Sequence, residues 1–193
     1  KGYMKDFENI SELLRYRSVK KPNKIFVIEG KKKYSFSDIN HLVDCCCFFF
    51  KKLGLKQRDI LSFNLKNSVE FVIIYFACIR ANIIANPLPH TISEIETLEK
   101  IKFLKSRYLF TDSIFKKIKN LYTINQKNKT KFITTILNSN LKKNEYFTKI
   151  DNKKTAVLYY SSGTTSNPKI IEYSYHSMIN LQKAMAKIKF TNL

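Results

Sequence analysis

The stretch YYSSGTTSNPK, residues 159–169, is the densest group of small hydroxyl side chains in the chain and ends in a lysine. Hydroxyl groups and freed backbone N–H groups donate hydrogen bonds to phosphate oxygens, and a lysine ammonium adds a positive charge. The groups that could hold a triphosphate are Ser161, Ser162, Gly163, Thr164, Thr165, Ser166 and Lys169. A polar turn between two strands could have the same composition, so the surrounding sequence has to separate the two interpretations.

The stretch is not a Walker A loop, whose pattern is G-x-x-x-x-G-K-[ST]. Counted from Gly163, Pro168 occupies the second glycine position and Ile170 follows the lysine. The β-rich alternation of residues 169–175 predicts a strand directly after the loop, followed by a helix at residues 177–188. A helix N-terminus is therefore not expected to hold the phosphate groups.

The elements that would position this stretch alternate along the chain. A hairpin is predicted at residues 24–36, and apolar residues at three- and four-residue steps predict a helix from an N-cap at Ser35 to Gly54. Further helices are predicted at residues 68–81, 93–105 and 113–121, strands at residues 59–65, 82–89, 107–111, 131–137 and 155–161, and a loop at residues 138–154. Strands that alternate with helices indicate an α/β fold: a layered, largely parallel sheet with flanking helices.

The chain is strongly basic, with 35 Lys and Arg against 15 Asp and Glu and a formal net charge of +20. Nearly all of these cations are lysines, scattered along the chain, and few arginines could make forked contacts to bases or phosphates. We interpret the lysines as a solvated surface and expect no nucleic-acid partner. A lysine-rich RNA-binding module is kept as an alternative, which would show a steep salt dependence of binding.

The four cysteines do not form a disulfide scaffold. Cys45, Cys46 and Cys47 are consecutive, and adjacent cysteines do not readily reach bridging geometry. Together with Cys78 they lack the spacing of metal ligands, so no metal site is predicted. A reducing, cytoplasmic compartment is therefore expected. The apolar run at residues 71–79 is too short to span a bilayer.

The stretch at residues 159–169 resembles the phosphate-binding signature Y-T-S-G-T-T-G-x-P-K-G of the AMP-forming adenylating enzymes, which include acyl-CoA synthetases, luciferases and amino-acid adenylation domains. The resemblance extends over the preceding chain. An opening hairpin and helix are followed by a strand like G-x-x-x-G-D-x-V, an N-S-x-E-F helix, and segments like A-C-x-x-A-G and P-L-x-P. Residues 1–193 are thus identified as the N-terminal portion of an AMP-dependent synthetase and ligase domain, whose C-terminal part we expect to be absent.

This resemblance implies a two-step reaction. A carboxylate attacks the α-phosphorus of ATP and releases pyrophosphate, and a thiol, usually that of CoA, then takes the acyl group. The loop would hold the β- and γ-phosphates together with Mg²⁺, with Thr164, Thr165 and Lys169 foremost. Catalytic residues are expected beyond Leu193, so residues 1–193 alone are expected to be inactive. An amino-acid adenylation domain that loads a carrier thiol, and a non-catalytic member of the family, are kept as alternatives.

Several positions depart from the family pattern. Ser166 and Ile170 stand at usual glycine positions, and Asn82 replaces the glycine of A-C-x-x-A-G. If position 166 requires a positive φ, serine introduces strain there that glycine would not. His176 lies one place beyond the loop-proximal histidine of many relatives, with Tyr175 at the matching position, and we expect His176 to be a partly buried or surface residue.

Overall fold

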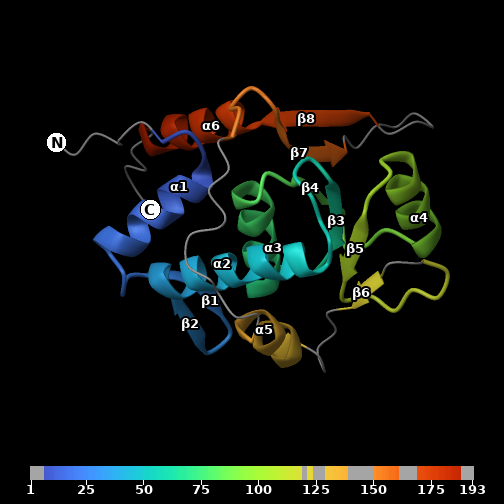
Figure 1. The fold of residues 1–193 in the computed structure, drawn as a ribbon, viewed down its shortest axis with the longest axis horizontal. Helices are drawn as coiled ribbons and strands as arrows, with labels where there is room; N and C mark the ends of the chain where they lie inside the picture. The colour runs from blue at the N-terminus through green and yellow to red at the C-terminus, as the bar shows by residue number, and fades with distance from the viewer. Residues whose placement is uncertain (1–6, 119–120, 124–128, 139–149, 161–168, 188–193) are drawn as a thin grey trace.

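The computed structural model describes residues 7–118, 121–123, 129–138, 150–160 and 169–187. Within them, a six-stranded sheet has the order β6-β5-β3-β4-β7-β8 (Figure 1). Its strands are β3 (Ile60–Asn64), β4 (Ile84–Pro87), β5 (Tyr108–Thr111), β6 (Leu121–Thr123), β7 (Thr155–Tyr160) and β8 (Ile170–Ser174). All neighbours pair in parallel except β7 and β8, which are antiparallel. The predicted layered, largely parallel sheet is confirmed.

The remaining elements are a hairpin and six helices in the described part of the chain. The hairpin is formed by β1 (Ile25–Glu29) and β2 (Lys32–Ser35), as predicted. The helices are α1 (Ile10–Lys20), α2 (Phe36–Lys52), α3 (Val69–Arg80), α4 (Glu94–Phe103), α5 (Lys129–Leu137) and α6 (Tyr175–Lys187). Ser35 and Asp38 cap α2 reciprocally, and Gly54 follows its end with φ 77°. Local sequence signals thus set both ends of α2.

The helix predicted at residues 113–121 is wrong. Residues 112–118 contain bends and no regular structure, and β6 begins at Leu121. The backbone N–H groups of Lys116 and Lys117 each donate a hydrogen bond of 2.6 Å to Glu94 Oε1 at the start of α4. The backbone of this segment is thus bound to the start of α4 by a carboxylate from another element.

The strand predicted at residues 131–137 is also wrong, because these residues belong to α5. The β-branched composition of KFITTIL favoured a strand. In the structure Phe132 and Ile136, one helical turn apart, are 2% and 0% exposed and join the core under α2. Burial of this pair outweighs the propensity of single residues. The helix α1 and the strand β6 were not predicted, and most of the predicted loop at 138–154 lies outside the described residues.

The sheet has one apolar and one polar face. Leu61, Phe63, Ala85 and Phe110 point into a core shared with α1, α2, α3 and α5. The other face lies toward α4, on the opposite side of the sheet in Figure 1. On that face Ser62, Asn64, Asn86 and Thr111 are polar and yet fully buried, with 0% exposure each. Buried polar groups on adjacent strands require hydrogen-bond partners.

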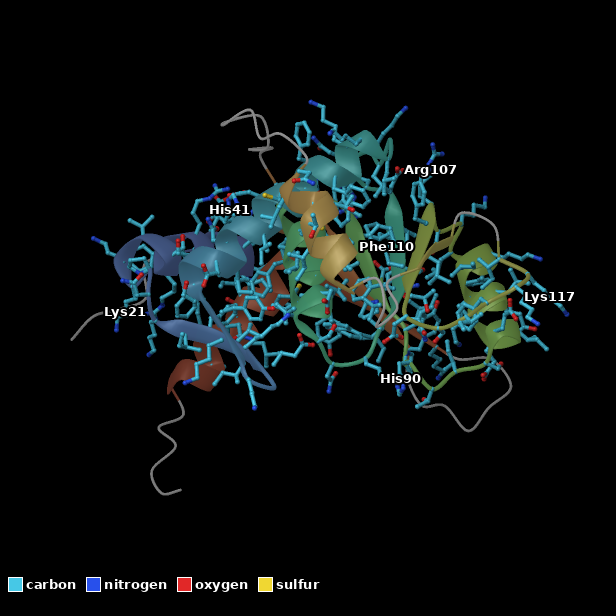
Figure 2. The ribbon with its side chains drawn as sticks, turned by 90° about the horizontal axis from the view of Figure 1, so that it is seen from below. Lys21, His41, His90, Arg107, Phe110 and Lys117 are labelled. Atoms are coloured by element: carbon cyan, nitrogen blue, oxygen red, sulfur yellow. The ribbon has the colours of Figure 1, made fainter. Side chains whose placement is uncertain are left out.

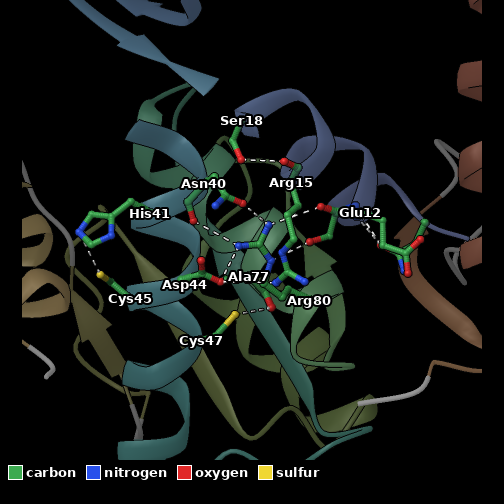
Figure 3. Close-up of polar contacts among 12 residues, drawn as sticks. Glu12, Arg15, Ser18, Asn40, His41, Asp44, Cys45, Cys47, Ala77 and Arg80 are labelled. Atoms are coloured by element: carbon green, nitrogen blue, oxygen red, sulfur yellow. Dashed lines mark hydrogen bonds and ion pairs between the residues drawn. The ribbon is translucent and has the colours of Figure 1, made fainter. Parts of the chain in front are cut away.

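An arginine joins three of the helices on the apolar face, α1, α2 and α3 (Figure 3). The buried Arg80 guanidinium donates to Asp44 Oδ1 at 2.7 Å, to the carbonyl and amide oxygens of Asn40 at 3.2 and 2.9 Å, and to Ser11 Oγ at 2.9 Å. Arg15 lies 3.8 Å from the same carboxylate. The Arg80 guanidinium, on α3, thus connects α1 and α2 through charge-assisted hydrogen bonds.

The four cysteine thiols are buried and free. Burial raises the pKa of Cys45 to about 11 and that of Cys47 to about 12. Since the thiolate is the nucleophile, alkylation at pH 8 is expected to leave all four thiols unmodified in the folded protein and to modify all four in denaturant. Mass spectrometry of cysteine peptides measures both states. Rapid modification of Cys46 or Cys78 without denaturant would contradict the packing of α2 on α3.

Candidate functional site

A cavity of about 420 Å³ opens where β3, β4 and β7 end. Its walls come from residues 65–67 after β3, from residues 87–90 at the end of β4, from Phe71 of α3, and from Tyr159 and Tyr160 of β7. Figure 2 shows His90 and Arg107 at opposite ends of the strands, with His90 at the carboxyl end. The helix after β3 covers one face of the sheet and the helix after β4 covers the other. A crevice at the carboxyl ends of two such strands is the usual ligand position in α/β sheets.

The first anchor of the 161–168 stretch is Tyr159, on the apolar side of the sheet. Its hydroxyl lies 3.1 Å from the hydroxyl of Tyr75 on α3, and its ring meets the ring of Tyr173 edge-on, with centres 5.5 Å apart. Burial, together with the hydrogen bond to Tyr159, raises the pKa of Tyr75. The Tyr75 hydroxyl therefore stays protonated at neutral pH, and Tyr159 is held by contacts with both Tyr75 and Tyr173.

The second anchor is Tyr160, which faces α4. The ammonium of Lys100 lies 4.2 Å from the centre of the Tyr160 ring, a cation–π contact. Tyr160 also packs against the small apolar cluster of Leu88, Leu109 and Ile118. Consecutive residues of β7 are thus held on opposite faces of the sheet, directly before residue 161.

The exit from the stretch lies beside its entrance. Tyr160 and Ile170 are paired residues of the antiparallel strands β7 and β8, so residues 161–169 form the connection of a hairpin. Lys169, the last of them, is exposed next to this pair. The two predicted strands and the helix after them are confirmed by β7, β8 and α6, while the predicted loop at 161–168 lies outside the described residues. Ser161, Ser162, Gly163, Thr164, Thr165 and Ser166 lie outside the described residues, and the assignment of all seven groups to phosphate stays a prediction.

Asn82 stands where the family pattern has glycine, and its backbone conformation explains why glycine is usual at that position. Asn82 has φ 55°, in the left-handed region that asparagine tolerates better than most residues. Its side-chain oxygen accepts a hydrogen bond of 3.1 Å from the hydroxyl of Tyr175, which is only 1% exposed. Its Nδ2 donates to Gln57 Oε1 at 3.3 Å. Tyr175 is therefore a core residue that links α6 to the turn before β4.

Replacing Asn82 tests this backbone requirement. Asn82→Ala and Asn82→Gly both remove the hydrogen bonds to Tyr175 and Gln57, but only alanine resists the left-handed conformation. We expect the alanine variant to be less stable than the glycine variant by about 1 kcal/mol. Urea unfolding of both proteins measures the difference. Equal stabilities would mean that the turn adopts another conformation.

His176 is exposed, as expected. Its backbone N–H donates to the Asn152 carbonyl at 2.9 Å, and its ring Nε2 lies 2.8 Å from Nδ2 of Asn180 one turn later on α6. These contacts hold the start of the helix at the surface. Sequence reasoning did not single out the cavity residues Phe71 and His90, since they are distant in sequence from the hydroxyl-rich stretch.

Magnesium is usually held by one or two carboxylates and by the phosphates of its nucleotide. The described residues that line the cavity include no carboxylate. No group of three or more His, Cys, Asp or Glu side chains within the described ranges could hold a metal ion. The described part of the cavity wall therefore offers no carboxylate ligand for magnesium. Of the helices in the same ranges, none combines the length and the apolar content needed to cross a membrane.

Curated proteins that are similar in sequence include two CoA ligases. The medium-chain fatty-acid–CoA ligase of Escherichia coli strain K12 is 26% identical over 96 residues, which cover 49% of this chain and 17% of that protein. The 2-succinylbenzoate–CoA ligase of Bacillus pumilus strain SAFR-032 is 24% identical over 166 residues, which cover 84% of this chain and 32% of that protein. The matches thus span a third or less of each relative.

The fold matches that of a solved structure, the NpsA N-terminal subdomain of Klebsiella oxytoca in complex with 3-hydroxybenzoyl-AMSN. The TM-score is 0.73 at 16% identity, and the match covers 88% of this chain and 41% of that chain. The sequence model of the family described as AMP-binding enzyme matches residues 14–192. Because that match covers nearly the whole chain, the protein belongs to the AMP-binding enzyme family, and its fold is that of an N-terminal subdomain in this family.

Proposed function

We propose that residues 1–193 are the N-terminal portion of a cytoplasmic, ATP-dependent acid–CoA ligase. The observation that carries this proposal is the similarity to a CoA ligase over 166 residues, most of the chain. The cavity at the strand ends supports it, because the cavity adjoins both tyrosines that precede the phosphate-binding stretch. The buried free thiols suit a reducing compartment.

In the first half-reaction, a carboxylate oxygen of the acid bonds to the α-phosphorus of ATP. The bond to the β-phosphate bridging oxygen breaks, and pyrophosphate leaves with its electron pair. Ser161, Ser162, Gly163, Thr164, Thr165 and Ser166 would donate hydrogen bonds to the β- and γ-phosphates, and Lys169 would balance the negative charge that grows on the leaving group. In the second half-reaction the thiol of CoA attacks the acyl carbon, and AMP leaves.

The test uses the full-length protein with ATP, magnesium and separate carboxylic acids: medium-chain fatty acids, aromatic acids and amino acids. We expect pyrophosphate release that requires one class of acid, and an acyl-CoA product by mass spectrometry when CoA is added. Activation of an amino acid without any CoA product would identify an adenylation domain that loads a carrier thiol. No acid-dependent pyrophosphate with any acid would indicate a non-catalytic member of the family.

A further inference from the structure

A second cavity lies toward the other end of the sheet from the candidate site. Its volume is about 570 Å³, and its walls come from the second half of α4, from the turn that leads into β5 and from the segment before β6. It shares no lining residue with the first cavity. Figure 2 shows one of its residues, Arg107, at the end of the strands opposite to His90, and another, Lys117, beside α4. A hollow of this size is typical of sites for small molecules.

The wall of this second cavity is strongly basic. Four cations line it, together with three apolar side chains and one serine: Lys102, Lys105, Arg107 and Lys117, with Leu98, Ile101, Ile118 and Ser106. The described residues of the wall include no carboxylate, and none of the four cations is in an ion pair with a described residue. Like charges gathered around one hollow repel each other, and an anion bound between them would relieve that repulsion.

The dipole of α4 accounts for only half of this cluster. Lys102 and Lys105 lie at the end of the helix, where cations interact favourably with the last carbonyl groups. Arg107 precedes β5, and Lys117 belongs to the segment before β6, so neither is part of the helix. The tertiary fold brings these two charges to the same cavity, where the repulsion has no compensating local gain.

The turn that carries Lys105 is held in an unusual conformation. Lys105 has φ 53°, in the left-handed region where helices usually end on glycine. The Ser106 N–H donates to the Ile101 carbonyl at 2.8 Å, and the Ser106 hydroxyl lies 2.6 Å from that of the buried Ser62. A lysine at a glycine position in a firmly held turn suggests that its side chain has a use there.

The backbone of the other two cations is also held. The Arg107 N–H donates to the Ile60 carbonyl of β3 at 2.8 Å. The Lys117 N–H donates to Glu94 Oε1 at 2.6 Å, and the next residue, Ile118, is buried. The four charges therefore extend from backbone positions that are set before any ligand arrives, which lowers the ordering cost of binding.

We propose that this second cavity binds a small molecule that carries two or more phosphate groups. Lysine ammoniums bind phosphate as point charges, and the Arg107 guanidinium can bind two phosphate oxygens at once. The hollow shape favours a compact anion, since a membrane or a nucleic-acid duplex would instead need an extended basic surface. This site is separate from the proposed ligase reaction and does not depend on it.

The experiment is a calorimetric titration of the full-length protein with inorganic tripolyphosphate. Every protein carries Lys169→Ala, so that binding at the hydroxyl-rich stretch is weakened. Adding Arg107→Ala and Lys117→Ala together should raise the Kd by about 5–10-fold, as expected for two solvent-exposed charge contacts. Lys105→Gly removes one charge and suits the left-handed turn, so it should raise the Kd by about 2–5-fold while making the protein more stable in urea.

The matched control is Lys31→Ala with Lys33→Ala, which removes the same charge from exposed positions of the hairpin, away from α4 in Figure 1. It should leave the Kd unchanged. An equal loss in this control would mean general attraction to a basic protein and overturns the inference, as does a wild-type cavity that binds no tripolyphosphate. Binding to phosphatidylserine vesicles or to an RNA oligonucleotide that needs Arg107 and Lys117, without binding of tripolyphosphate, also overturns it. A protein without ligase activity would refute the proposed function and leave this titration unaffected.

Discussion

Lys169→Ala in the full-length protein is expected to lower the rate of acyl-adenylate formation by about 10²–10³-fold, the loss typical when one stabilising donor is removed from a transition state. Lys169 follows the hydroxyl-rich stretch directly and precedes Ile170, which pairs with Tyr160. Its charge is needed most while negative charge develops on pyrophosphate. Transfer of the acyl group from pre-formed acyl-adenylate to the thiol should hardly change, since that step involves no pyrophosphate.

Separate assays of the two half-reactions measure this effect. Lys169→Arg should restore only part of the rate, because a planar guanidinium does not replace a compact ammonium at a tight turn. Lys153→Ala, which removes another exposed lysine before β7, serves as the control and should leave both rates near the wild-type values. Equal losses in both half-reactions would instead assign Lys169 a structural role.

Asp44→Ala is expected to lower the free energy of unfolding by about 2–3 kcal/mol. Removing one partner of a buried ion pair typically costs about 3–5 kcal/mol, because the other charge is left uncompensated. The Arg80 side chain is only 3% exposed, but the Asp44 side chain is 32% exposed. Because the carboxylate is partly solvated, we expect a loss of stability below that range. Asn40 and Ser11 would still accept hydrogen bonds from the guanidinium.

Urea unfolding of the purified variant gives this value, and Glu99→Ala on the exposed side of α4 is the control. Surface substitutions of that kind usually change stability by less than about 0.5 kcal/mol. Asp44→Asn, which retains an acceptor but removes the charge, should fall between the two. A wild-type stability for Asp44→Ala would show that the carboxylate contributes nothing to the junction of α1, α2 and α3.

Local chemistry allowed much of the fold to be predicted. The capping box of Ser35 and Asp38 and the glycine after α2 act within a few residues, so they operate in the same way whatever lies around them. The alternation of strands and helices favoured a parallel sheet for a similar reason, since parallel neighbours need a crossover between them. The order of two strands and a helix from β7 to α6 also followed from local pattern, whereas the antiparallel pairing of β7 with β8 came from the structure.

The two wrong elements show where local chemistry was insufficient. At residues 113–121 the apolar spacing favoured a helix, but Glu94 binds the backbone donors of Lys116 and Lys117 from a different element. At residues 131–137 the β-branched residues favoured a strand, but the core under α2 buries Phe132 and Ile136 on one helical face. In both places the deciding partner lies far away in the sequence.

The same distinction applies to the candidate site. The sequence by itself determined which groups could bind phosphate, because hydroxyls, a glycine and a lysine have that capacity wherever they occur. Only the tertiary structure decided what surrounds these groups. Parallel pairing brings the ends of β3 and β4 beside the end of β7. Residues 65–67 and 87–90 therefore form a cavity with Tyr159 and Tyr160. The hydroxyls of Tyr75 and Tyr159 lie 3.1 Å apart although the two residues are 84 positions apart in the sequence, and only the tertiary fold, which no local pattern specifies, placed them together.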